Sequence, residues 1–228
     1  MCGRFTNEMT WSQIHALYKL SDKLHPVAPS NLQPRHNIAP TQDVDIVHLD
    51  KAGELELDRG RWWLVPFFAK ELPKAAMFNA RIETVDISGA FREGFKSRRC
   101  LIPADGYFEW TKAEDGGKDP WLLQMPNGQP FSFAGIWARN DNLGVTSCTI
   151  ITAPAVPEIA HLHDRMPVIL APEAYGTWLD TRVQGKDAKA LLLDAQIDHM
   201  LEFHRVDRAV NSSRYDGTDT KKPLINSL

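Results

Sequence analysis

The chain has 228 residues, 43% of them hydrophobic and 24% charged, which excludes a disordered, collagen-like or coiled-coil protein. This length can bury a sizeable core, and we expect a single domain over residues 1–228 with a C-terminal tail from about residue 216. Lysine and arginine number 26 and aspartate and glutamate 29, so the net charge is −3. Nucleic-acid binding through bulk positive charge is therefore excluded, and any such site has to be a local patch.

The sequence pattern predicts a cytoplasmic protein without a membrane partner. No apolar run approaches the ~18 residues of a membrane helix, and the first residues lack the apolar core of a signal peptide. Three scattered cysteines, Cys2, Cys100 and Cys148, lack the paired spacing of a zinc site or a disulfide framework. We expect no metal, no cofactor and a monomer, with Cys100 and Cys148 as buried thiols.

The first half of the chain predicts two helices and a hairpin. Thr10 and Gln13 form a capping-box pattern ahead of a helix over about residues 11–20, and three prolines predict a loop over residues 22–36. Strands over residues 44–49 and 55–57 flank a Lys-Ala-Gly turn, which indicates a hairpin. Residues 87–99 are predicted to be helical. Their basic residues, Arg92, Lys96, Arg98 and Arg99, fit either a nucleic-acid backbone channel or a solvated helix face.

The second half adds strands over residues 107–111, 147–152 and 201–206 and helices over about residues 172–180 and 186–195. Strands over 121–125 and 131–137 flank Pro126-Asn127-Gly128, a strong turn signal that predicts a second hairpin. Hairpins with irregularly inserted helices indicate an α+β fold, with a curled, mostly antiparallel sheet and helices packed outside it.

Cys2 is the first candidate for chemistry, because loss of Met1 would leave an amine and a thiol on adjacent carbons. An α-amine has a pKa near ~7.7–8, so a neutral fraction exists at pH 7 and can attack an aldehyde to give a Schiff base. The thiol can then add to the imine and close a thiazolidine. The thiol alone could instead attack a carbonyl, and a merely tolerated small residue at position 2 is the third alternative.

Three further candidates are polar residues in apolar surroundings. Glu109 stands among Tyr107, Phe108 and Trp110, where desolvation would raise its pKa into a useful acid–base range unless it faces solvent. His163 could move a proton near neutral pH, although the neighbouring His161 competes for that role. Asn79 could orient the amine or a substrate oxygen, or simply cap a turn.

Arginines and aromatic residues suggest how a nucleic acid could be held. Arg4, Arg81 and Arg165 have the planar forks that bind phosphates, although surface salt bridges would explain them equally well. Residues 62–68 are unusually aromatic, and such side chains can stack on single-stranded bases or fill a core.

Five segments in order resemble the SRAP family, the SOS response-associated peptidases that process abasic sites. They begin at Cys2, Asn37, Asn79, Gly106 and His163 and read Cys-Gly-Arg-Phe, Asn-Ile-Ala-Pro-Thr, Asn-Ala-Arg-Ile-Glu-Thr, Gly-Tyr-Phe-Glu-Trp and His-Asp-Arg-Met-Pro. The resemblance spans residues 2 to about 215, including a closing segment over residues 206–211, and implies the barrel-like α+β fold of that family.

The resemblance also implies a function in the DNA-damage response. It implies that Cys2, freed of Met1 by the protein itself or by a general aminopeptidase, crosslinks to an abasic site in single-stranded DNA and shields the lesion. On that pattern Glu109 and His163 transfer protons and Asn79 positions Cys2 and the sugar, which is lyase- or hydrolase-type chemistry. The residues implied to contact DNA are Arg4, Arg81, Thr152, Arg165, Trp63 and Phe68.

One segment departs from the family pattern. Where the family usually reads Trp-Gly-Leu-Val-Pro-Ser-Trp, residues 62–68 read Trp-Trp-Leu-Val-Pro-Phe-Phe. Base stacking is compatible with these replacements. A bulky Trp63 in place of glycine, however, restricts the backbone conformations that this position can adopt.

Two other functions fit the same residues. One is a peptidase or amidohydrolase with Cys2 as an N-terminal thiol nucleophile acting on small amides or peptides. The other is a non-catalytic single-strand binding module that uses only the aromatic residues and arginines.

Overall fold

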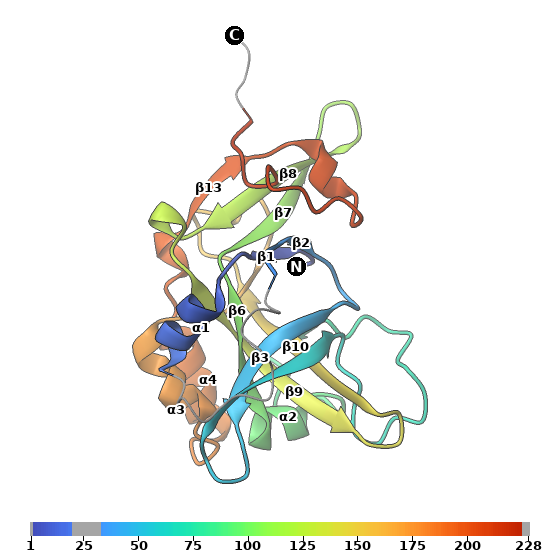
Figure 1. Cartoon of the computed structure of the whole chain (residues 1–228), viewed down its shortest axis with the longest axis vertical. Helices are drawn as coiled ribbons and strands as arrows, with labels where there is room; N and C mark the ends of the chain where they lie inside the picture. The colour runs from blue at the N-terminus through green and yellow to red at the C-terminus, as the bar shows by residue number, and fades with distance from the viewer. Residues whose placement is uncertain (1, 20–32, 225–228) are drawn as a thin grey trace.

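The computed structural model describes residues 2–19 and 33–224, which form two β-sheets with helices along one side (Figure 1). The larger sheet contains β3 (Asp43–Leu49), β4 (Leu55–Trp62), β5 (Asn79–Arg81), β6 (Arg99–Ala104), β9 (Phe131–Asn140), β10 (Val145–Pro154), β11 (Arg165–Pro167) and β12 (Ile169–Leu170). β10 pairs with β9 along one edge and with β4 along the other, so β3, β4, β10, β9 and β6 close into a barrel. In the described residues only the pairings of β10 with β4 and β5 are parallel, which confirms the predicted curled, mostly antiparallel and barrel-like α+β fold.

The smaller sheet is antiparallel and lies at one end of the barrel. Its strands, in spatial order, are β13 (Glu202–Arg205), β8 (Lys118–Gln124), β7 (Gly106–Lys112), β1 (Phe5–Asn7) and β2 (Arg35–Ile38). Only Asp105 separates β6 from β7, so one nearly continuous stretch of chain passes from the barrel into the smaller sheet. Because β1 pairs with β7, this stretch links the N-terminal strand β1 to the barrel.

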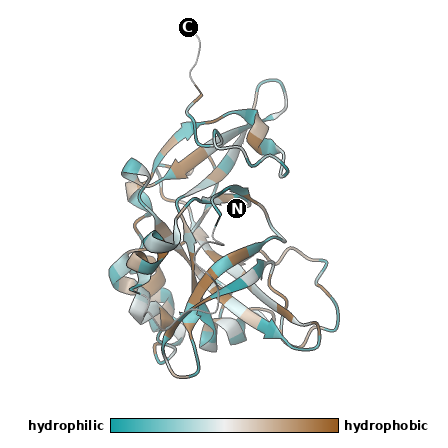
Figure 2. Ribbon diagram, viewed as in Figure 1, coloured by the Kyte–Doolittle hydropathy of each residue, from teal (hydrophilic) through white to brown (hydrophobic). Residues whose placement is uncertain are grey.

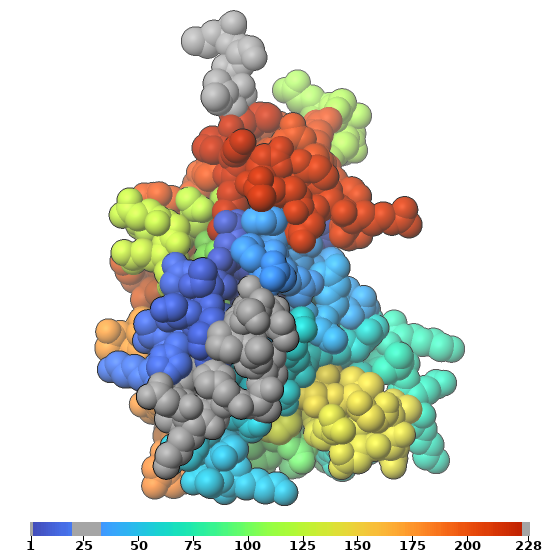
Figure 3. Space-filling model, in the orientation of Figure 1, coloured from blue at the N-terminus to red at the C-terminus, as the bar shows by residue number. Residues whose placement is uncertain are grey.

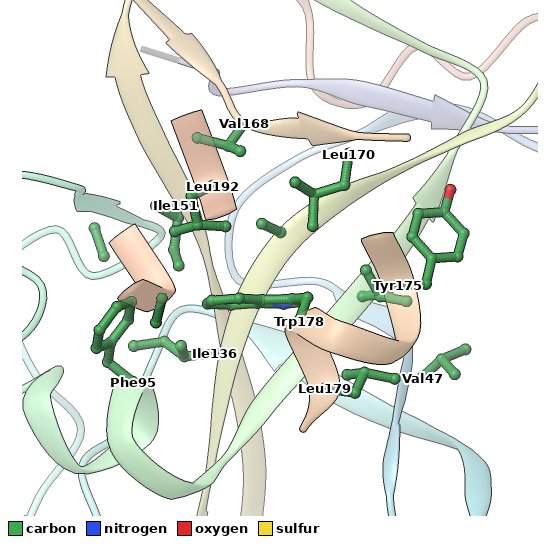
Figure 4. Packing of buried hydrophobic residues seen from close by; sticks show 14 of the residues in the cluster. Val47, Phe95, Ile136, Ile151, Val168, Leu170, Tyr175, Trp178, Leu179 and Leu192 are labelled. Atoms are coloured by element: carbon green, nitrogen blue, oxygen red, sulfur yellow. The ribbon is translucent and has the colours of Figure 1, made fainter. Parts of the chain in front are cut away.

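Helices cover one side of the barrel. They are α1 (Trp11–Tyr18), α2 (Arg92–Ser97), α3 (Tyr175–Leu179) and α4 (Gly185–Asp194), with the short 3₁₀ turns η2 (Pro126–Gly128), η3 (Pro172–Ala174) and η4 (Asp198–Met200). A further 3₁₀ turn, η5 (Arg208–Asn211), packs instead on β8 of the smaller sheet. The core beneath them centres on the fully buried Trp178, whose indole donates a 2.9 Å hydrogen bond to the carbonyl of Cys100 (Figure 4). Leu192 of α4 and Phe95 of α2 belong to the same buried cluster.

A second core joins the barrel to the smaller sheet. Phe5 packs edge-on against both Trp62 of β4 and Phe133 of β9, and Cys2 belongs to the same buried cluster. Hydrophobic residues recur along the strands in Figure 2, whereas the ends of many loops are hydrophilic. The contacts of Cys2 and Phe5 hold this N-terminal segment between the two sheets.

Most predicted elements are present. The capping box of Thr10 and Gln13 begins α1, which ends at Tyr18 with Lys19 in the left-handed conformation. The first predicted hairpin is formed by β3 and β4, although β4 extends to Trp62, beyond the predicted end at residue 57. Of the predicted loop over 22–36, residues 22–32 lie outside the described part, and the loop prediction is wrong for Arg35 and His36, which belong to β2.

The second predicted hairpin is wrong. Asn127 and Gly128 both adopt positive φ, 57° and 63°, so the turn itself exists. The strands on its two sides belong to different sheets, because β8 pairs with β7 and β13 whereas β9 pairs with β6, β10 and β12. A turn signal reports local backbone geometry and does not specify which strands pair across it.

The helix predicted over residues 87–99 is too long. Only Arg92–Ser97 form α2, and Arg99 already belongs to β6, where it pairs with Ile136. Ile87 is exposed, so the start of the predicted helix has no apolar contact to stabilise it. Arg99 is buried, with guanidinium donors directed at the carbonyls of Phe95, Trp178, Asp180 and Val183, so it does not belong to a solvated basic face or channel.

The C-terminal segment lies across the smaller sheet, next to the N-terminal residues (Figure 3). The amide of Leu224 donates to the carbonyl of Arg205, and the buried Thr220 hydroxyl donates to the carbonyl of His36. In the described part of the chain, no helix combines the length and apolar character needed to span a membrane.

Candidate functional site

Cys2 is buried just ahead of β1, and the pairing of β1 with β7 brings it toward Glu109. The register places Phe5 opposite Tyr107, and the amide of Phe108 donates a 3.0 Å hydrogen bond to the carbonyl of Arg4. Cys2 is 0% exposed and its thiol is free, as are those of the buried Cys100 and Cys148. Burial and the nearby negative charge of Glu109 raise the pKa of the Cys2 thiol far above its ordinary value, so the thiol stays protonated.

Asn79 reaches Cys2 from the barrel. It begins β5, which runs parallel to β10 with Asn79 opposite Ile150. The side-chain amide of Asn79 donates a 2.7 Å hydrogen bond to the backbone carbonyl of Cys2. The sequence proposed that Asn79 orients Cys2, and this contact is of the kind that such a role requires.

Glu109 is on β7 and is only 4% exposed. Burial, assisted by the charge of Asp164, raises the pKa of this carboxyl to about 7. At neutral pH the group is therefore present in both protonated and ionised forms, the condition under which a carboxyl can both accept and donate a proton. The sequence left open whether Glu109 faces solvent, and its burial answers that question.

His163 lies in the loop between β10 and β11 and lines the same cavity as Glu109, a space of about 490 Å³. Burial lowers the pKa of His163, so the neutral ring is favoured at neutral pH. Its Nδ1 accepts a 2.9 Å hydrogen bond from the amide of Arg165 and lies 2.8 Å from a carboxylate oxygen of Asp164, to which it would donate a hydrogen bond when the ring is protonated. His161 is exposed and packs on Phe203, so His163 is the histidine that lines this cavity.

Three of the predicted DNA contacts lie together at the end of β10. Thr152 pairs with Arg81 of β5 on one side and with Pro167 of β11 on the other, and Pro154 pairs with Arg165. Arg165 forms a two-pronged ion pair with Glu83, at 2.5 and 3.0 Å, and donates a 2.7 Å bond to the carbonyl of Thr152. Arg81 is exposed, and its guanidinium makes no hydrogen bond or ion pair with the described residues.

Arg4 lies elsewhere and contacts the C-terminal segment. Its guanidinium donates 2.9 Å hydrogen bonds to the Asn37 side chain and the Val210 carbonyl, and a 3.2 Å bond to the Asn211 carbonyl. It also lies over the ring of Trp110, 5.8 Å from the centroid. Phosphate binding by Arg4 stays a prediction. A phosphate would have to compete with these acceptors for the N–H donors of the guanidinium.

The aromatic segment forms a loop of residues 63–78 that leaves the barrel after β4 and returns at β5, the teal loop in Figure 1. Phe67 and Phe68 are 48% and 57% exposed and pack edge-on against each other. Trp63 is half-buried, stacks at a tilt on Phe78 and donates from its indole to the Pro73 carbonyl. Phe68 is thus available to a partner, whereas Trp63 supports the base of the loop.

The family model of the SOS response associated peptidases, SRAP, matches residues 1–213. The chain belongs to the SRAP family. It is 34% identical over 224 residues to the abasic site processing protein YoaM of Bacillus subtilis (strain 168), covering 96% of each chain. It is 30% identical over 229 residues to the abasic site processing protein YedK of Escherichia coli (strain K12), covering 98% of this chain and 100% of YedK.

Solved structures have the same fold as this SRAP chain. A crystal structure of a protein from Bacteroides thetaiotaomicron superposes with a TM-score of 0.82 at 23% identity, covering 98% of this chain and 100% of that one. A phage-related protein from Bordetella bronchiseptica gives a TM-score of 0.74 at 26% identity, covering 94% of this chain and 99% of that one.

Two residues of this SRAP site had no role assigned from sequence. Asn37 is buried, accepts from Arg4 and donates to the carbonyls of Ser212 and Tyr215, so it joins β2 to the C-terminal segment. Glu83 holds both terminal nitrogens of Arg165. Both stand in the quoted family motifs, but their partners are distant in sequence, and only the fold brings them together.

Proposed function

We propose that this SRAP protein binds abasic sites in single-stranded DNA and forms a covalent bond to them through Cys2. The carrying observation is that Glu109 and His163 line one cavity and that Glu109 lies close enough to the buried Cys2 for its charge to raise the pKa of the thiol. Asn79, from a further segment, holds the Cys2 carbonyl. The names of the relatives, abasic site processing proteins, support the lesion as the substrate.

The proposed reaction begins once Met1 has been removed and Cys2 carries the free amine. The amine nitrogen attacks the C1′ aldehyde of the ring-opened sugar, and loss of one water gives an imine. The Cys2 sulfur then adds to C1′ while its proton passes to the nitrogen, which closes a thiazolidine. The balance is aldehyde plus aminothiol giving thiazolidine and water, with no oxidant or reductant.

The protonated thiol favours this order of events. A peptidase with Cys2 as nucleophile would need a thiolate, and burial together with Glu109 opposes that form. The amine can act as a nucleophile at this pH, because a neutral fraction of an α-amine exists near pH 7. The alternative of an N-terminal-thiol hydrolase is therefore less well supported than an attack led by nitrogen.

Glu109 and His163 are the proposed proton carriers. Glu109, with a pKa of about 7, can give a proton to the departing hydroxyl and later take one up. His163 is neutral, lines the same cavity and would serve as the acid–base partner, including during reversal of the crosslink. Asn79 would hold Cys2 in place through the Cys2 carbonyl.

For the DNA strand itself, we propose that Arg81, Thr152 and Arg165 at the end of β10 contact phosphates and that Arg4 contributes from the smaller sheet. Phe68 would provide stacking surface for bases, together with the exposed part of the half-buried Trp63. Since the protein has a net charge of −3, affinity for intact DNA should be modest and selectivity should come from the covalent step.

Intact-mass spectrometry after incubation with a single-stranded oligonucleotide containing one abasic site tests the proposal. We expect the mass of protein without Met1 plus oligonucleotide minus one water, and no adduct with undamaged DNA. An abasic site reduced to the alcohol lacks the aldehyde and should also give none. Cys2→Ser should leave at most an imine that borohydride traps.

The proposal fails if protein with a free Cys2 gives no adduct with the abasic oligonucleotide. An equally heat-stable adduct from Cys2→Ala would remove the thiol from the mechanism. Retention of Met1 in an active crosslinking protein would exclude the amine as the attacking group, and hydrolysis of a peptide panel without DNA would favour the thiol hydrolase.

A further inference from the structure

The cavity that contains Glu109 and His163 continues along the β7–β8 hairpin. Its lining runs from Glu109 and Trp110 to Lys112 on β7 and includes Gly116, Gly117 and Lys118 on the other side of the turn. The hairpin tip projects past the C-terminal segment as the pale green loop in Figures 1 and 3. One end of this cavity therefore holds the proposed reaction centre, and the other has two lysines.

Lys112 and Lys118 face each other directly across the hairpin. They are register partners at the ends of β7 and β8, and the amide of Ala113 closes the turn on the carbonyl of Gly117. Like charges at directly opposite positions destabilise a strand pair. Both lysines are exposed, and neither forms a hydrogen bond from its side chain or an ion pair with the described residues. An unrelieved repulsion of this kind is what a bound anion would remove.

Two of the nearby carboxylates are paired with arginines. Asp115 in the turn pairs with Arg208 at 2.5 Å, and Asp119 pairs with Arg208 at 2.8 Å and with Arg205 at 2.7 Å. Glu114, also in the turn, is not among the residues that line the cavity. Among the residues that line this end of the cavity, the charge is therefore the positive charge of the two lysines.

We propose that Lys112 and Lys118 clamp a backbone phosphate of the DNA strand on one side of the abasic nucleotide. This inference rests on the proposed function, because that function puts the damaged sugar at Glu109 and His163. A strand leaving the sugar along the cavity would pass between the lysines, with Trp110 lining its path. Arg81, Thr152 and Arg165 come from the other sheet, so the two groups would hold the strand on opposite sides of the lesion.

The test compares two double variants that change the net charge equally. Lys112→Gln/Lys118→Gln removes the clamp, and Lys51→Gln/Lys186→Gln removes two exposed lysines from the β3–β4 turn and α4. The affinity for abasic DNA is measured against salt concentration with three oligonucleotides: one with both flanks, one truncated 5′ of the lesion and one truncated 3′ of it. Thermal unfolding of each variant is followed in parallel.

We expect the clamp variant to lower the slope of log affinity against log salt by about 0.7, the contribution of one phosphate contact on a single strand. The loss of affinity should be absent on one of the two truncated oligonucleotides, the one without the flank that the lysines contact. The melting temperature of the protein should stay equal or rise, because the repulsion between the lysines is gone. An unchanged slope, a loss equal to that of the control variant, or an equal loss on both truncated strands would overturn the clamp. If the wild-type protein crosslinks to none of the oligonucleotides, the proposed function itself has failed.

Discussion

The side-chain amide of Asn79 donates a 2.7 Å hydrogen bond to the backbone carbonyl of Cys2. Asn79 begins β5, whose partner β10 belongs to the barrel, whereas Cys2 precedes β1 of the smaller sheet. This one bond therefore ties the proposed nucleophile to the barrel. It acts on the carbonyl of Cys2 and does not involve the thiol, whose own contact is a 3.8 Å hydrogen bond to the carbonyl of Arg4.

Asn79→Ala should slow crosslinking and lower the free energy of unfolding by a similar, small free energy. Loss of the bond leaves the Cys2 carbonyl without this donor, at a cost of about 1 kcal/mol, and a similar loss of positioning would lower the rate by up to about tenfold. Single-turnover crosslinking and thermal unfolding measure the two effects. The exposed Asn142→Ala on the β9–β10 turn is the control and should change neither. A rate equal to that of the wild type would show that the bond has no part in positioning Cys2.

Glu109 should make the protein less stable as the pH rises toward neutrality. Its pKa of about 7 in the folded state lies above the value of about 4.3 expected when unfolded, so the folded state retains a proton that the unfolded chain has lost. The stabilisation is present below about pH 4 and is lost as the pH rises through about 7, by roughly 4 kcal/mol. Chemical denaturation at a series of pH values measures this slope.

Glu109→Gln should flatten that stability profile and, in the same variant, slow crosslinking. The exposed Glu202→Gln on β13 should keep the wild-type profile of both stability and rate. If Glu109→Gln retains the wild-type dependence of stability on pH, the carboxyl does not titrate near neutrality. If it retains the wild-type rate at every pH, Glu109 is not a proton carrier.

Local signals predicted the local structure well, and pairings between distant segments could not be read in the same way. The capping box at Thr10 needs only four residues and was predicted correctly. The turn at Asn127 and Gly128 was also recognised, yet the flanking strands pair elsewhere, because pairing depends on how β9 fits between β6 and β10 in the barrel. The site residues were recognisable from motif resemblance and chemical type, but their mutual contacts depend on strand register.

The burial of the Arg99 side chain likewise could not be predicted from the sequence, because its partners are distant along the chain. It was grouped with a basic run, and its burial depends on the carbonyls that α2, α3 and the segment after α3 present to it. Arg99→Lys should lower the free energy of unfolding by about 2–3 kcal/mol, because an ammonium cannot reach all these acceptors. Denaturant unfolding measures the loss, and the salt dependence of DNA binding should be unchanged.

Arg98→Lys is the matched control for this prediction. Arg98 lies over Trp137 at 5.9 Å, a partly exposed contact worth about 0.5–1 kcal/mol. The two substitutions remove the same chemical group from adjacent positions. Equal destabilisation by both would contradict the structural role of Arg99.

Phe68→Ala should weaken the binding of single-stranded DNA without weakening the fold. The side chain is 57% exposed on the loop between β4 and β5, so its loss removes little packing. If a base stacks on it, the binding free energy should weaken by about 1–3 kcal/mol. Leu72→Ala, 49% exposed on the same loop, removes a similar apolar area but no aromatic face and should cost much less. Fluorescence anisotropy with an undamaged oligonucleotide isolates this effect from the covalent step, and equal losses in the two variants would mean that apolar area, and not stacking, accounts for the contact.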